Sequence, residues 1–382
     1  MRVLLAFDKF KDALTAPAAC AIAAAVLRER QPGWTLDLCP LADGGEGFCD
    51  ILTRAAGGSF ETLTVTGPRG AAVEAALGFV ELSAVPAPAR ALLELGNAAG
   101  QIALVELATA SGLALLPAGE RDPWLTSSVG TGELVRHAAD RGASAILMGV
   151  GGSATHDLGL GALGALGLKC LSGDGRPVTP LRPEHWPRLA RFAGGVPASL
   201  PPLRIACDVA NPLLGPQGAA AVYGPQKGLR PADLARLDHE SARLAMMLCA
   251  HCGRPEALMD APGAGAAGGI AFGLVAAARA RLLPGYDLVA AWLDLEARLA
   301  AADIVITGEG RFDASSLQGK GPGALAARAL ALGKTVHVFA GAVGVAAPSG
   351  LALHAITPAG VPLAAALRAA PENLAVSLRA VF

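Results

Sequence analysis

The chain has 382 residues, a formal net charge of -1 and only 4% aromatic residues. A chain of this length is expected to contain roughly two or three domains. Because nucleic-acid-binding surfaces need basic patches and stacking rings, this composition excludes a nucleic-acid partner.

Neither membrane insertion nor secretion is predicted. Two charge-free runs, 261–278 and 335–367, are rich in Gly and Ala or interrupted by prolines, whereas a membrane span needs ~20 strongly apolar residues. The apolar run before Asp8 is too short for a signal peptide. The seven cysteines show no disulfide spacing, which is typical of a reducing compartment. We therefore expect a cytoplasmic protein; the oligomeric state stays open, a homo-oligomer included.

The first segments predict a β-α-β unit. Residues 2–7 are a short apolar run of the kind found in buried parallel strands. Thr15 and Pro17 mark the start of a helix. Residues 35–47 predict a strand that runs into a glycine-rich turn. This order of elements is typical of an α/β sheet.

The texture of the sequence changes near residue 60. In residues 61–82, threonines alternate with apolar residues, and a Gly-Pro-Arg-Gly turn and a second apolar stretch follow. This pattern predicts a hairpin. The next elements are strand candidates at 90–96, 102–108, 144–150 and 202–208, and a long helix over 229–252. From about residue 290, helices and apolar strands alternate again as they do at the start.

Because the two ends of the chain resemble each other and the middle differs, we predict an α/β fold of two α/β domains. The first is a parallel-sheet Rossmann/flavodoxin-like domain formed by residues 1–60 and 290–382. The second is a mixed α/β domain, residues 61–289, inserted into the first. Chain termini commonly lie close together, so such insertions are tolerated.

A dinucleotide fingerprint is present in residues 149–164, GVGGSATHDLGLGALG, where Gly159, Gly161 and Gly164 have the G-x-G-x-x-G spacing. That fingerprint should open a helix directly after a strand. Here it begins eight residues after Gly151, where a helix should already be running. A second match, at 263–268, follows no strand. We therefore interpret both matches as chance in a chain with 48 glycines.

The glycines that directly follow the strand have a different expected use. Gly151 and Gly152, with Ser153, predict a backbone nest whose N–H groups bind an anion at a helix N-terminus. A tight structural turn is the alternative.

Several other loops combine glycine with charged residues after predicted strands. In open α/β sheets such loops gather at the carboxyl ends of the strands, where ligands bind. Glycine amides and lysines hold phosphates, carboxylates hold magnesium, and one carboxylate accepts a hydroxyl proton, so the set fits phosphoryl transfer. The candidates are Asp8, Lys11, Asp43, Glu46, Ser127, Thr131, Glu133, Ser153, Asp157, Asp208, Asn211, Lys227, Glu309, Arg311, Asp313 and Lys320.

These segments, in this order, resemble the type-1 glycerate kinases along nearly the whole chain. The matching segments are FDKFKDALTA, PLADGGEG, TSSVGTGEL, GVGGSATHDLG, ACDVANPLLGPQGAAAVYGPQKG, PGAGAAGG and ITGEGRFDASSLQGKGPGALA. The resemblance implies phosphate transfer from ATP to D-glycerate, usually giving 2-phosphoglycerate. It also implies two α/β domains, one inserted in the other, with the active site in the cleft between them.

The resemblance and the residue chemistry together assign expected roles. Catalytic residues are expected among Asp208, Asp157, Asp43 and Lys11. Substrate or nucleotide contacts are expected from Asp8, Gly44, Gly45, Glu46, Gly151, Gly152, Ser153, Asn211, Lys227, Glu309, Arg311 and Lys320. Mg²⁺ is expected at Asp43, Glu46 and Asp313.

Asp208 is favoured as the general base because it follows a strand and precedes a sharp Asn-Pro turn. Asp43 and Asp157 are the alternatives, and an Asx-turn is the structural alternative for Asp208. Two other functions stay open: a 2-hydroxy-acid dehydrogenase, and a non-catalytic sensor of small anions on the same scaffold.

Overall fold

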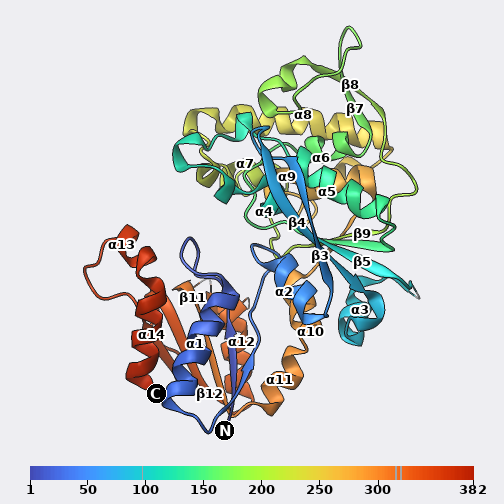
Figure 1. Cartoon of the computed structure of the whole chain (residues 1–382). Coiled ribbons are helices and arrows are strands. Elements are labelled where there is room, and N and C mark those ends of the chain that lie inside the picture. Colours follow the sequence, from blue (N-terminus) through green and yellow to red (C-terminus); the bar gives the residue numbers. More distant parts are fainter. Residues whose placement is uncertain (97, 315, 319–320) are drawn as a thin grey trace. The chain divides into compact units, whose positions relative to one another are not determined.

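The computed structural model describes residues 1–96, 98–314, 316–318 and 321–382 and divides into two compact units (Figure 1). Unit 1 contains residues 1–43 and 289–382, and unit 2 contains residues 44–288. The predicted fold class is confirmed: a parallel-sheet domain built from both termini, and a second mixed α/β domain inserted into it.

The units divide at 43/44 and 288/289, whereas the sequence prediction set the domain boundaries at 60 and 290. The segment that makes the first difference is α2, Phe48–Ala55. This helix buries Phe48, Ile51 and Leu52 and packs against three strands of unit 2. Its apolar face therefore belongs to the core of the second unit.

Unit 1 is built on a five-stranded parallel sheet with the order β13-β12-β11-β1-β2. The strands are β1 Arg2–Phe7, β2 Thr35–Leu38, β11 Ile304–Phe312, β12 Thr335–Val343 and β13 Leu351–Ala355. From β1 the chain proceeds to β2 on one side, and β11, β12 and β13 follow on the other. The strand order thus reverses between β1 and β11, and open α/β sheets bind ligands at the carboxyl ends of the strands at such a point.

Helices cover this sheet. They are α1 Ala16–Arg30, α11 Leu295–Ala301, α12 Gly321–Ala331, α13 Leu363–Arg368 and α14 Ala370–Val381. The predicted start of the first helix is correct: the Thr15 hydroxyl accepts a hydrogen bond from the Ala18 N–H, and Pro17 lies in the first turn. Helices α1 and α14 pack together, and their apolar faces join Val3, Leu5 and Phe7 of β1 in one core.

Unit 2 contains a six-stranded mixed sheet with the order β10-β9-β6-β5-β4-β3. The strands are β3 Ser59–Thr66, β4 Ala72–Glu81, β5 Gln101–Glu106, β6 Ala145–Gly149, β9 Leu203–Ala206 and β10 Arg281–Leu283. β3 and β4 form the predicted hairpin, and β5, β6, β9 and β10 run parallel. A separate hairpin consists of β7 Leu168–Ser172 and β8 Leu189–Gly194.

The remaining helices belong to unit 2, except α10, which crosses the division. They are α3 Ala87–Leu93, α4 Leu107–Ser111, α5 Val129–Asp140, α6 Leu160–Ala165, α7 Ala219–Tyr223, α8 Leu234–Cys252, α9 Ala266–Ala278 and α10 Gly285–Trp292. The predicted strand at 90–96 was wrong, because residues 90–93 belong to α3, which Pro86 and Pro88 start, and residues 94–96 follow its end. Within the described residues, no helix is both long and apolar enough to cross a bilayer.

Candidate functional site

A cavity of about 730 Å³ lies at the carboxyl ends of the strands of unit 1. Asp8 follows β1, and Glu309 and Arg311 lie at the end of β11, so the polar part of the cavity occupies the point where the strand order reverses. Another part of its wall is apolar. That wall is formed by Val343, Ile356, Val361, Leu363, Ala366 and Leu367.

One lysine bridges two carboxylates in this cavity. The Lys9 Nζ lies 3.3 Å from Asp43 Oδ1 and 4.0 Å from Asp8 Oδ1. Burial raises the pKa of Asp8 to about 6; the charge of Lys9 opposes this rise and the charge of Asp43 adds to it. The Asp8 carboxyl is therefore poorly compensated by the protein alone.

Glu309 extends this carboxylate group. Burial raises the pKa of Glu309 to about 7; a hydrogen bond from Ser316 opposes the rise, and the charges of Asp8, Asp313 and Asp43 increase it. The Glu309 Oε1 atom is buried and makes no hydrogen bond to any described residue. Asp8, Asp43 and Glu309 thus form a cluster of negative charge that a cation would stabilise.

The other predicted residues of unit 1 are more exposed. Lys11 lines the cavity from the surface, and Arg311 forms an ion pair with Asp313 at 3.0 Å between Nε and Oδ2. Lys320, expected to bind phosphate, lies outside the described residues.

In unit 2 the predicted glycine loops pack on each other. The Gly151 N–H donates a hydrogen bond to the Gly44 carbonyl at 3.0 Å. A Cβ on Gly151 would lie 2.5 Å from Gly45 Cα, and a Cβ on Gly152 would lie 3.4 Å from Glu46 Oε1. Glycine is therefore needed for the close approach of two backbones. The Gly151 N–H, expected to bind an anion, already has a backbone acceptor.

Ser153 and Lys227 form a direct pair. The Lys227 ammonium donates to Ser153 Oγ at 2.8 Å and to the Thr155 carbonyl at 2.6 Å. Lys227 is 1% exposed, and burial lowers its pKa to about 7. The sequence predicted that Lys227 contacts substrate or nucleotide, and the structure buries its ammonium inside unit 2.

Asp157 is also buried, with 0% exposure. Its carboxylate accepts hydrogen bonds from the Ser128 N–H and hydroxyl, both at 2.8 Å, and from the N–H groups of Gly159 and Gly161 at 3.1 and 3.2 Å. The carboxylate joins the start of α5 to the start of α6. A base must reach its substrate, so this geometry gives no support to Asp157 in that role.

The two G-x-G-x-x-G matches are explained by these contacts. Gly159 and Gly161 donate to the Asp157 carboxylate. In the second match, the Gly268 carbonyl accepts from the Leu158 N–H at 3.2 Å, and a Cβ on Gly268 would lie 2.1 Å from the Thr155 carbonyl oxygen. The glycines thus allow two loops of unit 2 to pack closely.

Asp208 and Asn211 follow β9. The half-buried Asp208 accepts a hydrogen bond at Oδ2 from the Tyr286 N–H at the start of α10, at 2.8 Å. The Asn211 Nδ2 donates to the Gln217 carbonyl at 2.8 Å, and its Oδ1 accepts from the Tyr223 hydroxyl at 2.6 Å. Both ends of the Asn211 amide therefore stabilise the loop itself.

Sequence reasoning did not identify Glu106 at the end of β5. This buried carboxylate accepts hydrogen bonds from the Gly47 and Cys49 N–H groups, at 3.1 and 3.2 Å, and so stabilises the start of α2. Its signal in the sequence is a single acid at the end of an otherwise apolar strand.

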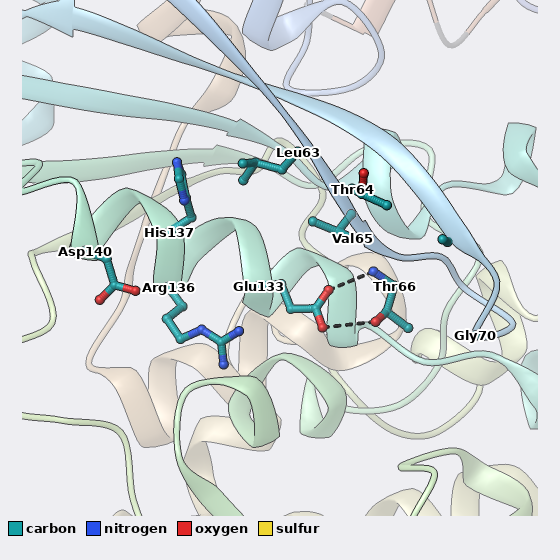
Figure 2. A pocket seen from close by; sticks show the side chains of 10 residues that line it. Leu63, Thr64, Val65, Thr66, Gly70, Glu133, Arg136, His137 and Asp140 are labelled. Atoms are coloured by element: carbon teal, nitrogen blue, oxygen red, sulfur yellow. Dashed lines mark hydrogen bonds between the residues drawn. The ribbon is translucent and has the colours of Figure 1, made fainter.

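A second cavity, of about 530 Å³, lies between β3 and α5 (Figure 2). Its charged groups hold the strand to the helix. Glu133 accepts hydrogen bonds from the Thr66 N–H and hydroxyl, at 2.7 and 3.0 Å, and His137 Nε2 lies 2.8 Å from a Glu61 carboxylate oxygen. We therefore assign these groups, including the candidate Glu133, to the structure of unit 2.

Comparisons with known proteins agree on one family. The sequence model of the glycerate kinase family matches residues 3–382. Glycerate kinase of Bacillus subtilis (strain 168) is 36% identical over 381 residues, which cover 98% of this chain and 95% of that protein. Glycerate 2-kinase of Escherichia coli (strain K12) is 36% identical over 338 residues, covering 84% and 80% respectively.

A solved structure resembles the chain as well. It is the crystal structure of a protein provisionally named glycerate kinase 2 from Salmonella typhimurium LT2, with a TM-score of 0.76 and 36% sequence identity. The match covers 100% of this chain and 97% of that one.

Proposed function

The chain belongs to the glycerate kinase family, and from this membership we propose that it transfers the γ-phosphoryl group of ATP to the 2-hydroxyl of D-glycerate. The products would be 2-phosphoglycerate and ADP. The names of the relatives from B. subtilis and E. coli support glycerate as the acceptor, and the second name supports position 2.

The observation that carries the proposal is the cavity of unit 1. It combines an apolar wall, suited to the base of a nucleotide, with the charged residues Asp8, Lys9 and Lys11 at the carboxyl ends of parallel strands. Ligand sites typically combine an apolar wall with a few convergent polar groups. We therefore assign the nucleotide to unit 1, where the lysines would face its phosphates.

Mg²⁺ fits the carboxylate cluster of this cavity. Asp8 and Glu309 have raised pKa values, and a buried Glu309 oxygen has no hydrogen-bond partner among the described residues. A bound cation would therefore stabilise the ionised carboxylates of the cluster. No set of three or more His, Cys, Asp or Glu side chains forms a ready metal site in the described part of the chain. Proteins often hold Mg²⁺ with one or two carboxylates and the substrate's phosphates.

We propose that one or two carboxylates of the cluster of Asp43, Asp8 and Glu309 would hold the ion, which would neutralise charge on the transferring phosphoryl group. The other two residues expected at the metal have different surroundings. Asp313 is paired with Arg311, and Glu46 lies beside the Gly151–Gly152 loop of unit 2.

The acceptor needs a general base and a partner for its carboxylate. Asp208 stays our proposed base: it is half-buried at the carboxyl end of β9, and one of its oxygens is fixed by the Tyr286 N–H. It would take the 2-hydroxyl proton as the hydroxyl oxygen attacks the γ-phosphorus and ADP departs. Arg311 stays a candidate for the glycerate carboxylate because a guanidinium matches carboxylate geometry.

We also propose a cytoplasmic location. None of the seven cysteines, all of which lie in the described part of the chain, belongs to a disulfide, as expected in reducing compartments.

A coupled ADP-release assay tests this function. Purified protein with Mg²⁺ and ATP should release ADP when D-glycerate is added, and only at background rate without it. A parallel absorbance assay with NADH and hydroxypyruvate tests the dehydrogenase alternative. Glycerate binding without ADP release or NADH oxidation would favour the anion sensor and would overturn the kinase proposal.

A further inference from the structure

Lys227 is a buried cation without a contacting carboxylate. It ends a short 3₁₀ helix, Pro225–Lys227, and its ammonium contacts Ser153 Oγ and the Thr155 carbonyl. Within the described residues, no carboxylate oxygen lies within 4.0 Å of the ammonium. A buried charge that lacks a counter-ion is costly, so this site calls for an anion that the protein does not itself provide.

Ser153 is the group through which such an anion could be bound. Because its oxygen accepts a hydrogen bond from Lys227, the hydroxyl proton must point away from the ammonium. That hydroxyl donates to no acceptor among the described residues, and Ser153 keeps 7% exposure in the loop that follows the carboxyl end of β6. The result is a fixed O–H donor at the ligand-binding edge of a parallel sheet.

The neighbouring groups compensate the positive charge of Lys227 only in part. The Asp157 carboxylate raises the pKa of Lys227 from a distance, but its oxygens are engaged by Ser128, Gly159 and Gly161. Burial and the charge of Lys227 lower the pKa of His156 to about 3, so this imidazole is neutral.

Unused polar atoms surround the same loop. The buried atoms Thr155 Oγ1 and His156 Nδ1 have no hydrogen-bond partner among the described residues. A hydroxyl can donate a hydrogen bond to an oxyanion. The loop therefore has buried polar atoms that its own hydrogen bonds leave unsatisfied.

We propose that Lys227 is a positioning residue that acts through Ser153: the ammonium fixes the Ser153 hydroxyl as a donor to an oxyanion of the substrate and supplies the opposing charge without touching that oxyanion. The inference rests on the proposed function. Within it, we assign the oxyanion to the carboxylate of the hydroxy acid, with the phosphate oxygens of the nucleotide as the other source of the same chemistry.

This arrangement makes anion binding depend on the protonation state of Lys227. Deprotonated Lys227 would keep neither the charge nor the same hydrogen bond to Ser153, so affinity for the acid should fall as the pH rises above about 7. The titratable groups that act on the ammonium are His156 and Asp157. Replacement of Lys227 should abolish this pH dependence, whereas a dependence caused by Asp157 would persist.

The test is a double-mutant cycle on the full chain with Ser153→Ala, Lys227→Met and the double variant. Each single change should raise KM for D-glycerate by ~10-fold or more, which is the usual loss for a hydrogen bond to a charged group. The KM for ATP should stay within about twofold. The KM of the double variant for D-glycerate should be no higher than that of the single variant with the higher KM. Lys169→Met, which removes an exposed lysine on β7, is the matched control.

Three outcomes would overturn the inference. An unchanged KM for D-glycerate in folded variants would leave Lys227 a purely structural residue. Additive losses in the double variant would show that the two residues act independently. A rise in KM for ATP alone would assign the oxyanion to the nucleotide instead of the acid.

A binding measurement separates this inference from the proposed function and from misfolding. Calorimetric titration of D-glycerate into the wild type and Ser153→Ala, without ATP, should show weaker binding for the variant at pH 6.5 and a smaller difference at pH 8.5, where Lys227 is mostly neutral. If the wild type binds glycerate but never releases ADP, the kinase proposal fails while the inference stands. Equal binding by both proteins overturns the inference, whether or not Lys227→Met folds.

Discussion

The Asp157 carboxylate accepts hydrogen bonds from both the backbone N–H and the hydroxyl of Ser128, each at 2.8 Å. It also accepts hydrogen bonds from the N–H groups of Gly159 and Gly161 at the start of α6. Asp157 therefore joins two segments that are distant in the sequence, and its place in the GGSATHD motif has a structural cause. A residue of this kind should affect stability more than chemistry.

Asp157→Asn is accordingly expected to destabilise the protein by about 2–4 kcal/mol, because an amide nitrogen would face donors that now bond a carboxylate oxygen. The kcat per folded molecule should change only a few-fold. Urea unfolding measures the first effect, with the exposed Asp174→Asn as control. A large loss of kcat at unchanged stability would instead return Asp157 to the list of bases.

The Asp208→Asn substitution distinguishes a role of Asp208 as general base from a role as cap at the start of α10. The asparagine oxygen can still accept from the Tyr286 N–H, so folding should survive. The amide cannot take a proton, so kcat should fall by ~10²-fold or more while ATP binding persists. Asp208→Ala removes the cap as well, so it should also lower the free energy of unfolding by about 1 kcal/mol. If Asp208→Asn keeps nearly full kcat, Asp43 becomes the better candidate for the base.

Glu309→Gln tests the proposed magnesium site. Removal of this carboxylate should raise the Mg²⁺ concentration for half-maximal turnover by ~10–100-fold. Turnover of the wild type should vanish in excess EDTA and return with Mg²⁺. Glu296→Gln, which removes an exposed carboxylate paired with Arg328, is the matched control. An unchanged Mg²⁺ requirement in Glu309→Gln would remove Glu309 from the site.

The stacked pair His337 and His354, whose Nδ1 and Nε2 atoms lie 3.1 Å apart, should make stability depend on pH. Burial lowers the pKa of both rings, and the proximity of His354 lowers that of His337 further. The folded state thus binds protons more weakly than the unfolded chain. The free energy of unfolding should be highest above the ordinary pKa of 6.5 and fall as the pH drops below it.

Denaturant unfolding between pH 5 and pH 8 measures this dependence. The double variant His337→Gln/His354→Gln should have a flatter profile over the same range. An equally steep profile in the variant would assign the dependence to other groups.

Much of the scaffold was readable from the sequence because strand ends carry local signals. The apolar run before Asp8 and the Thr15–Pro17 helix start lie where the structure has them. The helix at 87–93 was missed because its apolar residues fit a strand equally well.

The candidate site was harder to predict, since burial depends on distant segments. Lys227 was expected to contact substrate or nucleotide and Asp157 to be catalytic, but segments more than 25 residues away along the chain enclose both side chains and use their charges. The apolar wall of the unit 1 cavity comes from residues such as Ile356 and Leu367, which carry no motif. Residue type was visible in the sequence, whereas accessibility was not.

The most direct test of the proposed reaction is the ³¹P NMR spectrum of the product formed from ATP, Mg²⁺ and D-glycerate by the purified chain. Phosphorus on the 2-oxygen couples to the single hydrogen on carbon 2, so 2-phosphoglycerate gives a doublet beside the signals of ADP. That doublet is the result we predict. A triplet, from coupling to the two hydrogens on carbon 3, would contradict the position of transfer, and a spectrum with no phosphomonoester would contradict the kinase reaction itself.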